Sequence, residues 1–504
     1  MSRLNAVCLL LSALPAAAAT CESLASLTLP HTAITRAESV AAGAFTPPGG
    51  RPMPNLPSFC RVAGTLTPSA DSDIRFEVWL PASGWNGKFQ GVGNGGYAGS
   101  ITYPGLAASI AAGYAAASTD TGHEAGGTDA SWALSHPEKA VDFAYRAIHE
   151  TTVAGKTIVK AFYGDQPKRA YFSSCSNGGR QALMEAQRYP EDYDGIIAGA
   201  PANYWTHLLS NAIWVVQATA SDPASFIPPA KLPAIESAAL AACDASDGVK
   251  DGVIDRPDQC AFKPASLLCD GADSDACLTG PQVHALEKIL GGIPAPKGEK
   301  TFPGFVLGGI TGNGGWSAWI TGSAPARSLA FAFGSNFFAN IVFQDKNWDW
   351  HTFQPIRDMK IADDKAARTL NATDPDLGRF AARGGKLILY HGWSDAAISP
   401  LNSIDYYRSV QAKMGAEADD VVRLYMVPGM QHCGGGPGPS VFEHDMRAAL
   451  ERWVEGGPAP VRITATKEKS PGVVERTRPL CPWPQSAHYK GSGSTDDAAN
   501  FVCQ

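Results

Sequence analysis

Short apolar runs alternate with longer amphipathic stretches in the first part of the chain. Residues 76–80, 88–92 and 169–172 are rich in β-branched and aromatic side chains, which predicts three strands. Residues 129–162 carry apolar positions at helical spacing, and residues 179–188 form a second amphipathic stretch, which predicts helices there. Strands that alternate with helices in this way predict a parallel sheet covered by helices.

The pattern changes between residues 203 and 372. This segment holds four cysteines and many glycines and prolines, and its second half is rich in tryptophan. The alternation then returns, with apolar runs at 386–390 and 421–426 that predict two more strands. We therefore expect an α/β core made of residues 20–202 and 373–504, split by a large inserted lid domain at 203–372.

Residues 1–19 have the pattern of a secretory signal peptide. Arg3 gives a basic start, residues 6–14 form an apolar segment, and residues 17–19 are alanines that suit a cleavage site. The apolar segment is too short to span a bilayer. A buried N-terminal helix and a lipoprotein signal before Cys21 are the alternatives, and the threonine directly before that cysteine counts against the second. We expect a secreted or periplasmic protein.

Composition excludes two classes of partner. The chain of 504 residues has 44% hydrophobic and 18% charged residues, as ordinary globular proteins do. Acidic residues outnumber basic ones, 48 to 41, and no block of lysines or arginines stands out. We therefore expect neither a nucleic-acid partner nor attachment to a membrane.

The cysteines of the chain form an even set once a signal peptide that carries Cys8 is removed. Ten remain, and an even number in an exported chain predicts five disulfides. Proximity in the sequence favours four local pairs and leaves two distant cysteines for each other, although many other pairings satisfy the same count. The favoured pairs are Cys21–Cys60, Cys243–Cys260, Cys269–Cys277, Cys481–Cys503 and Cys175–Cys433.

A candidate nucleophile stands at the end of the third predicted strand. The segment YFSSCSNGGRQALM (171–184) places Ser176 between that strand and an amphipathic helix, as in a nucleophile elbow. An elbow needs small residues two positions before and two positions after its serine, and Ser174 and Gly178 stand there. Serine departs from the usual glycine at the first of these positions. Taken alone, the segment also fits an ordinary glycine-rich turn.

Two later loops supply partners for this serine. Asp395 follows the strand predicted at 386–390, in HGWSDAAISP, and His432 follows the strand predicted at 421–426, in PGMQHCGGG. A serine nucleophile needs a base to accept its proton and a carboxylate to orient that base. α/β-Hydrolases carry these residues in the order serine, acid, histidine, on loops that follow strands. We predict an α/β-hydrolase core with Ser176 as nucleophile, Asp395 as triad acid and His432 as general base.

Other residues could fill these roles, but their positions suit them less. Residues 392–396 form a second elbow-like sequence, yet no helix is expected directly after them. His123 and His391 do not follow the last predicted strand, and His207 lies in the expected lid. The position of Asp194 is typical of a turn between a helix and a strand. We expect structural roles for all of them.

Backbone N–H groups near Ser176 are candidates for an oxyanion hole, which stabilises the negative charge of an acyl-transfer reaction. One donor is the N–H of Asn177, directly after the nucleophile. The other is expected in the glycine-rich loop GNGGYAGS (93–100), with Gly95 favoured and Gly96 next. The same glycines also fit a plain turn.

Both Ser176 and His432 stand directly beside a cysteine. If Cys175 and Cys433 are bonded, the disulfide holds the nucleophile loop against the base loop. The alternative is that Cys175 is a thiol nucleophile. An oxidising compartment and an even number of cysteines disfavour that alternative.

The motifs around these residues resemble the tannase and feruloyl esterase family, which also includes an enzyme that hydrolyses mono(2-hydroxyethyl) terephthalate. The adjacent Cys-Ser and His-Cys dipeptides make the resemblance specific, and it extends from about Cys21 to Cys503. It implies an α/β-hydrolase core with a large lid, the five disulfides above, and hydrolysis of esters of aromatic acids. The matching motifs are GNGGYAG (93–99), CSNGGR (175–180), HGWSD (391–395), PGMQHCGGG (428–436) and CPWPQSAHYKGSG (481–493).

An acidic loop in the expected lid is a candidate calcium site. Asp244, Asp247, Asp251 and Asp255 lie within DASDGVKDGVIDRPDQ (244–259). Carboxylates this close repel one another unless a cation neutralises them, and oxygen ligands suit Ca²⁺. A solvated acidic turn is the alternative. The resemblance implies a structural Ca²⁺ with the ligands Asp244, Asp247, Asp251 and the backbone carbonyls of Val249 and Val253.

Aromatic residues at 316–338 are candidates for the substrate pocket, although the same density is typical of a core. We expect Trp319 and Phe337 to contact the acyl group. No basic residue lies between residues 327 and 346, whereas a free carboxylate on the acyl ring would favour an arginine. This weakly favours neutral phenolic acyl groups, feruloyl first, over a terephthalate monoester.

The sequence thus predicts a secreted serine esterase that acts on esters of phenolic acids, free or linked to polysaccharide, through an acyl-enzyme on Ser176. Galloyl esters and terephthalate monoesters are the alternative substrates. A catalytically inactive, calcium-dependent binding protein on the same scaffold is the alternative from another class. Turnover of an aryl ester by the wild type, lost in Ser176→Ala, would separate the enzyme from the binding protein.

Overall fold

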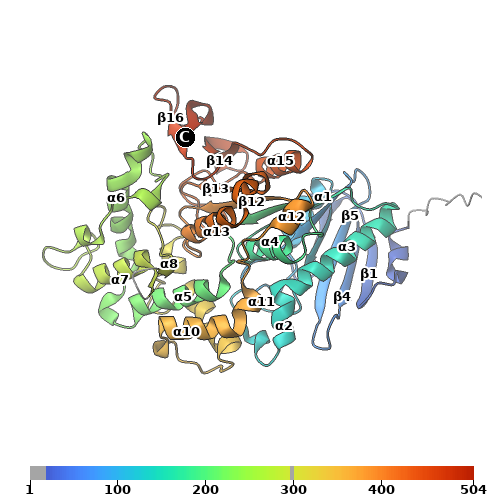
Figure 1. Cartoon of the computed structure of the whole chain (residues 1–504), viewed down its shortest axis with the longest axis horizontal. Coiled ribbons are helices and arrows are strands. Elements are labelled where there is room, and N and C mark those ends of the chain that lie inside the picture. The colour runs from blue at the N-terminus through green and yellow to red at the C-terminus, as the bar shows by residue number, and fades with distance from the viewer. Residues whose placement is uncertain (1–18, 296–299) are drawn as a thin grey trace, which may run out of the picture.

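A computed structural model describes residues 19–295 and 300–504 (Figure 1). Apart from Ala19, the predicted signal peptide lies outside the described residues. The centre of the described part is a nine-stranded sheet in the order β1-β4-β5-β7-β6-β8-β9-β12-β13. The strands from β1 to β7 in this order pair antiparallel, and those from β7 to β13 pair in parallel. Its strands are β1 (Thr32–Val40), β4 (Phe59–Leu66), β5 (Ile74–Pro81), β7 (Ala115–Thr119), β6 (Lys88–Val92), β8 (Arg169–Cys175), β9 (Gly195–Gly199), β12 (Lys386–Gly392) and β13 (Val422–Val427).

Helices cover both faces of the parallel strands, so successive side chains along a strand enter two different apolar clusters. Phe172 and Ile196 pack in the cluster under α3, α4 and α13, whereas Tyr171 and Ile197 pack in the cluster under α15. Burial on both faces explains why these strands are continuous apolar runs, and it confirms the predicted α/β-hydrolase fold class. The covering helices are α1 (Tyr103–Ala111), α3 (Ala147–Tyr163), α4 (Asn177–Arg188), α12 (Gly378–Ala382), α13 (Pro400–Met414), α14 (Ala418–Val421) and α15 (Glu443–Val454).

The helical stretch expected at 129–162 is less regular than its periodicity suggests. It starts with a 3₁₀ turn at Ser131–Ala133 and continues as α2 (Pro137–Val141), a π-helical turn at Asp142–Arg146, and then α3. Pro137 can begin a helix but cannot continue one from the preceding turn, because it lacks an N–H donor. The apolar spacing predicted the helix, and the proline set the break.

The segment between β9 and β12 contains the residues expected to form the lid, and it lies beside the sheet in Figure 1 (green to orange). Its long helix α5 packs against α7, α9 and α10, which makes α5 the centre of the segment. The elements here are α5 (Trp205–Ala220), α6 (Leu232–Cys243), α7 (Gly280–Gly291), β10 (Ile293–Pro294), β11 (Lys300–Phe302), α8 (Trp316–Trp319), α9 (Leu329–Asn336), α10 (Pro355–Ala362) and α11 (Arg368–Leu370).

Short antiparallel ribbons complete the described chain, and the sequence analysis did not predict them. Two follow α15 at the C-terminus, and one lies near the N-terminus. None of the described helices has both the length and the apolar character needed to cross a membrane. The ribbon strands are β2 (Gly43–Phe45) with β3 (Met53–Leu56), β14 (Ile463–Ser470) with β15 (Val473–Leu480), and β16 (Ala487–Tyr489) with β17 (Phe501–Cys503).

Candidate active site

Ser176 occupies a sharp turn between β8 and α4. Its backbone has φ 66° and ψ −126°, a conformation that strains any residue other than glycine. The Ser176 N–H donates to the carbonyl of Gly199 at 2.9 Å, and the Ser176 carbonyl accepts from the N–H groups of Arg180 and Ala202 at 3.1 Å each. These bonds fix the strained turn at the carboxyl end of β8.

Close packing explains why small residues surround the turn. A Cβ atom at Gly178 would lie 1.9 Å from Oγ of Ser174, and one at Gly179 would lie 2.3 Å from the carbonyl oxygen of Gly199. Neither position therefore admits a side chain. Ser174 replaces the usual glycine two residues before the nucleophile, and its hydroxyl occupies the space that Gly178 leaves open.

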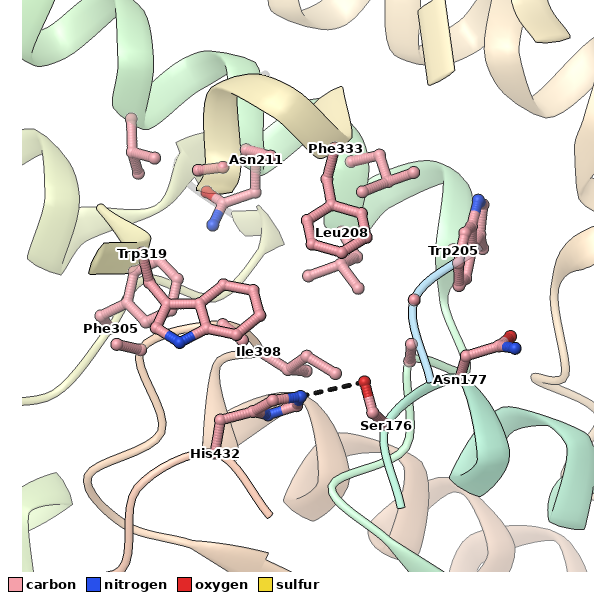
Figure 2. Close-up of a pocket in the computed structure, with 18 residues that line it drawn as sticks. Ser176, Asn177, Trp205, Leu208, Asn211, Phe305, Trp319, Phe333, Ile398 and His432 are labelled. Atoms are coloured by element: carbon pink, nitrogen blue, oxygen red, sulfur yellow. Dashed lines mark hydrogen bonds between the residues drawn. The ribbon is translucent and has the colours of Figure 1, made fainter. Parts of the chain in front are cut away.

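The structure brings Ser176, His432 and Asp395 together in one hydrogen-bonded chain. Oγ of Ser176 lies 2.9 Å from Nε2 of His432 (Figure 2). Nδ1 of His432 lies 2.8 Å from Oδ2 of Asp395. Asp395 follows β12 and His432 follows β13, on the loops where the sequence placed them. This geometry allows the imidazole to accept the serine proton while the carboxylate fixes the tautomer of the ring.

Asp395 is held as a buried carboxylate. Its Oδ1 accepts the N–H groups of Ala397 at 2.8 Å and Ile398 at 3.0 Å, and Nε2 of His391 lies 3.2 Å from its Oδ2. Burial acts to raise the pKa of Asp395, but the neighbouring His432 and His391 outweigh burial and hold this pKa below its usual value. The carboxylate therefore stays ionised. His391, considered above as another base, contacts the acid rather than the serine.

All five predicted disulfides are formed in the described part of the chain. Cys175–Cys433 joins the residue before Ser176 to the residue after His432, with Cα atoms 5.9 Å apart. It therefore connects the nucleophile loop to the base loop. Because Cys175 is bonded, it offers no thiol, and the alternative of a cysteine nucleophile is wrong. The other pairs are Cys21–Cys60, Cys243–Cys260, Cys269–Cys277 and Cys481–Cys503.

The lining of the pocket beside Ser176 distinguishes between the residues expected to donate to the oxyanion. Asn177 and Gly96 both line this pocket, whereas Gly95 is not among its described lining residues. A Cβ atom at Gly96, where φ is 57°, would lie 2.2 Å from the carbonyl oxygen of Gly127, so only glycine fits there. The geometry thus favours Gly96, the second choice from sequence, over Gly95.

Two residues of α4 that the sequence analysis did not single out hold these loops in place. Gln181 donates from Nε2 to Oδ1 of Asn94 at 2.7 Å and accepts the Asn94 N–H on Oε1 at 3.1 Å. Arg180 is fully buried and donates from Nε to Oδ1 of Asn177 at 2.9 Å. Their position directly after the nucleophile motif was the available signal, but their burial could not be read from it.

His123 anchors the glycine-rich loop from the other side. Its Nε2 lies 2.7 Å from the carbonyl oxygen of Tyr97, and its ring stacks on Trp132 with centroids 3.8 Å apart. Burial lowers the pKa of His123 to about 4. His123 therefore has the structural role expected from its position. Asp194 also matches its expectation, because it accepts the N–H of Ala170 at a strand start.

An apolar pocket opens next to Ser176 and His432 (Figure 2). Trp319 of α8 lies edge-on to the His432 ring with centroids 5.1 Å apart, and it stacks on Phe333 of α9 at 5.9 Å. The described lining residues include no lysine, arginine, aspartate or glutamate. The aliphatic lining residues of α5 are Leu208, Leu209, Ala212 and Val215.

Of the two aromatic residues expected to contact the acyl group, Trp319 lines this pocket and Phe337 does not. Phe337 is fully buried and packs against Phe338 with ring centroids 5.2 Å apart. The expectation for Phe337 is therefore corrected. A π-helical turn begins at Phe337, directly after α9, and directs the ring into the lid core. Phe333, one turn earlier on α9, lines the pocket instead.

The acidic loop of the lid wraps around its own carboxylates. Asp244 accepts the N–H groups of Asp251 at 3.2 Å and Gly252 at 3.1 Å. Asp251 also pairs with Arg476 and Arg478 of β15, which connects the lid to the C-terminal part of the core. The sequence analysis did not predict these two arginines. They lie far along the chain, in a ribbon it did not recognise.

Two carboxyl groups of this loop are destabilised as anions by their surroundings. Burial raises the pKa of Asp247 to about 6 and raises the pKa of Asp255 well above its usual value. Oδ2 of Asp255 is buried and has no hydrogen-bond partner among the described residues. An orphaned carboxylate oxygen surrounded by further carboxylates is the environment that a hard divalent cation stabilises. The residues present therefore fit Ca²⁺.

Comparison with known proteins agrees with this fold. Residues 60–504 match the family model described as tannase and feruloyl esterase. The chain is 43% identical to an uncharacterised esterase from Xanthomonas campestris pv. campestris, over 100% of this chain and 96% of that protein. It is 34% identical to mono(2-hydroxyethyl) terephthalate hydrolase from Piscinibacter sakaiensis, over 92% and 88% of the two chains.

A solved structure extends the agreement to three dimensions. The crystal structure of feruloyl esterase B from Aspergillus oryzae superposes with a TM-score of 0.88 at 31% identity and covers 96% of this chain and 99% of that one. The family model, the sequence relatives and the superposition point to one assignment. The chain is an esterase and belongs to the tannase and feruloyl esterase family.

Proposed function

We propose that the protein is an exported serine esterase that hydrolyses esters of phenolic acids, hydroxycinnamoyl esters such as feruloyl esters first, through an acyl-enzyme on Ser176. The observation that carries the proposal is the chain from Ser176 through His432 to Asp395, which opens into an apolar pocket. The family assignment supports ester hydrolysis, and the pocket supports an aromatic acyl group.

The first half-reaction forms the acyl-enzyme. Nε2 of His432 takes the proton of the Ser176 hydroxyl as its oxygen attacks the ester carbonyl, and ionised Asp395 stabilises the imidazolium that results. The N–H groups of Asn177 and Gly96 are the donors proposed for the developing oxyanion. His432 then gives its proton to the leaving oxygen, and the alcohol departs.

The second half-reaction releases the acid. Water enters the site that the alcohol has left, and His432 takes a proton from it as it attacks the acyl carbonyl. The tetrahedral intermediate uses the same two N–H donors. Its collapse returns the proton to Ser176 and frees the carboxylic acid.

The pocket supports a neutral aromatic acyl group. Trp319 and Phe333 offer flat apolar surface next to the reacting serine. A second carboxylate on the acyl group would be desolvated without a cationic partner, because no lysine or arginine is among the described lining residues. This argues against a terephthalate monoester, although one relative carries the name of a hydrolase of such an ester. Galloyl esters remain the second substrate candidate.

We propose a structural Ca²⁺ in the lid, held by Asp244, Asp247 and Asp251 with the carbonyls of Val249 and Val253. The ion would relieve the repulsion among the buried carboxylates of this loop. It would take no part in the reaction. Metal analysis should find one calcium per chain, and removal of the metal by a chelator should lower the melting temperature. An unchanged melting temperature in the calcium-free protein would contradict the site.

We propose that the protein acts in the periplasm or outside the cell. The signal-like first 19 residues and the five disulfides support an oxidising destination. The N-terminus of the mature protein, isolated from culture medium or periplasm, should begin close to Thr20.

The proposed activity is tested by kcat/KM for methyl ferulate, methyl gallate and mono(2-hydroxyethyl) terephthalate, measured for the wild type and for Ser176→Ala. We expect methyl ferulate to be the best of the three and all turnover to disappear in the variant. A catalytically inactive binding protein would hydrolyse none of them. A preference for the terephthalate monoester, or turnover that survives in Ser176→Ala, would contradict the proposal.

A further inference from the structure

One amide lies in the pocket wall away from the reacting groups. Asn211 projects from α5, on the helix face that also carries Leu208, Ala212 and Val215, and all four residues line the pocket. The residue is only 1% exposed, so its amide is almost entirely shielded from bulk solvent. A polar side chain in an otherwise aliphatic stripe needs an explanation.

The Asn211 amide has no hydrogen-bond partner within the part of the chain that the structure describes. Its Oδ1 is buried and unpaired. The buried amides of Asn94, Asn177 and Asn402, by contrast, bond Gln181, Arg180 and Asn203. Buried polar groups are almost always paired in folded proteins, because an unpaired one destabilises the fold. Packing therefore does not explain Asn211, whereas a bound ligand would.

The position of Asn211 relative to the serine suggests which part of a ligand it meets. Figure 2 shows its amide across the pocket from Ser176 and His432, with Trp319 and Phe333 lining the space between. A flat acyl group with its carbonyl at Ser176 would lie along these rings. Its far end would then reach the amide.

We propose that Asn211 determines acyl specificity by hydrogen bonding a hydroxyl group on the end of the aromatic ring remote from the ester. The inference rests on the proposed function, since it assumes that an aromatic acyl group occupies this pocket. An amide offers both donors and an acceptor, and a phenolic hydroxyl is also both donor and acceptor, so the two groups match in either orientation of the amide. The substrate class is therefore the 4-hydroxycinnamoyl esters.

The decisive quantity is the ratio of kcat/KM for methyl p-coumarate to kcat/KM for methyl cinnamate, which lacks the ring hydroxyl. We expect the wild type to favour the hydroxylated ester by about tenfold, the effect of one buried hydrogen bond left unmade with the other substrate. In Asn211→Leu, which keeps the branched shape and the number of non-hydrogen side-chain atoms, the ratio should fall to about 1. The ratio does not depend on how much of the variant is folded.

Val215→Ala provides the matched control, because Val215 lines the pocket one helical turn further along α5 and makes no hydrogen bond with its side chain. It should lower kcat/KM for both esters and leave their ratio at the wild-type value. A ratio that falls equally in both variants would show that pocket shape, not the amide, sets the preference, and would overturn the proposal.

Thermal stability gives a second, independent readout. Asn211→Leu removes an unpaired buried amide, so its melting temperature should rise by about 1–2 °C. A ratio that stays at the wild-type value in Asn211→Leu would mean that the amide does not hydrogen bond the ring hydroxyl. That result would overturn the role of Asn211 while methyl ferulate is still hydrolysed. A wild type that hydrolyses no aromatic ester would instead overturn the proposed function, and this inference with it.

Discussion

The core and the lid each contain a histidine–aspartate pair, and the two pairs are almost equally short. In the core, Nδ1 of His432 lies 2.8 Å from Asp395. In the lid, Nε2 of His207 lies 2.9 Å from Asp363. The difference is at the second ring nitrogen, where His432 faces the Ser176 hydroxyl and His207 faces the carbonyl oxygen of Thr301 at 2.9 Å.

This comparison shows that the pair itself does not make a catalytic site. Both nitrogens of His207 face acceptor oxygens, so neither can take a proton from a nucleophile. His432 has one nitrogen free for that purpose, next to a serine held in a strained turn and beside an apolar pocket. The role of each histidine is set by what its second nitrogen faces.

The largest expected effect separates the two aspartates. Asp395→Asn should lower kcat by about 10³–10⁴-fold, because an amide no longer holds the reactive tautomer of His432. Asp363→Asn, the equivalent change in the lid pair, should lower kcat by less than about threefold, because Asp363 touches no reacting group. Steady-state kinetics on methyl ferulate measures both. Equal losses in the two variants would mean that the two histidine–aspartate pairs do not differ in their contribution to the reaction.

The next effect concerns His123, which anchors the glycine-rich loop of the core. Its folded pKa of about 4 lies below the reference value near 6.5, so the unfolded chain binds a proton first as the pH falls. The stability contributed by the neutral imidazole is complete above pH 6.5 and is lost between pH 6.5 and 4. Linkage gives a loss of about 3 kcal/mol.

Urea unfolding at pH 7 and pH 4 checks this expectation. His123→Gln does not titrate, so its free energy of unfolding should fall by about 3 kcal/mol less than that of the wild type over this range. His444→Gln is the control, since the His444 side chain is 85% exposed. The acid response of this control should match the wild type. If the free energy of unfolding of His123→Gln also fell by as much as that of the wild type, the acid-induced loss of stability would not come from His123.

The disulfides extend the comparison of core and lid to covalent bonds. Replacing Cys175 and Cys433 together by alanine should lower kcat/KM by about 10–100-fold, because the serine and imidazole loops lose their shared constraint. Replacing Cys269 and Cys277 removes a lid disulfide that touches no reacting group, and should change stability more than kcat/KM. Full activity of the Cys175/Cys433 double variant at 25 °C would contradict a role of this disulfide in aligning serine and imidazole.

The smallest expected effect lies within the lid. Trp319→Ala should raise KM for methyl ferulate by about tenfold, through the loss of one aromatic contact, with less change in kcat. Phe337→Leu alters a ring buried in the lid core, so it should lower the melting temperature and leave KM near the wild-type value. If Phe337→Leu raised KM more than Trp319→Ala, Phe337 would contact the acyl group, as the sequence predicted.

The sequence predicted the elements whose signals are local. Apolar runs located β8, β12 and the strand before His432, and the order of motifs identified Ser176, Asp395 and His432, which the structure brings together. What escaped prediction depends on contacts between distant segments. Asp251 meets Arg476 and Arg478 from a ribbon that periodicity did not reveal, and Arg180 is buried although its type is usually exposed.

The error at Phe337 has a similar origin. The expectation rested on the density of aromatic residues at 316–338, which does not say which rings face the pocket. A regular helix would carry Phe333 and Phe337 on one face, but a π-helical turn changes the register at Phe337. Such a turn has no clear sequence signal. The preference between Gly95 and Gly96 also depended on geometry, because two adjacent glycines are equivalent in a motif and differ only in which one faces the pocket.

The most direct measurement of the central claim is peptide mass spectrometry after reaction with a fluorophosphonate, which labels only a serine activated by a neighbouring base. We predict one adduct per chain on Ser176, loss of methyl ferulate hydrolysis in proportion to labelling, and no adduct in His432→Ala. Full ester hydrolysis after stoichiometric labelling, or an adduct on another residue with Ser176 unmodified, would contradict the account.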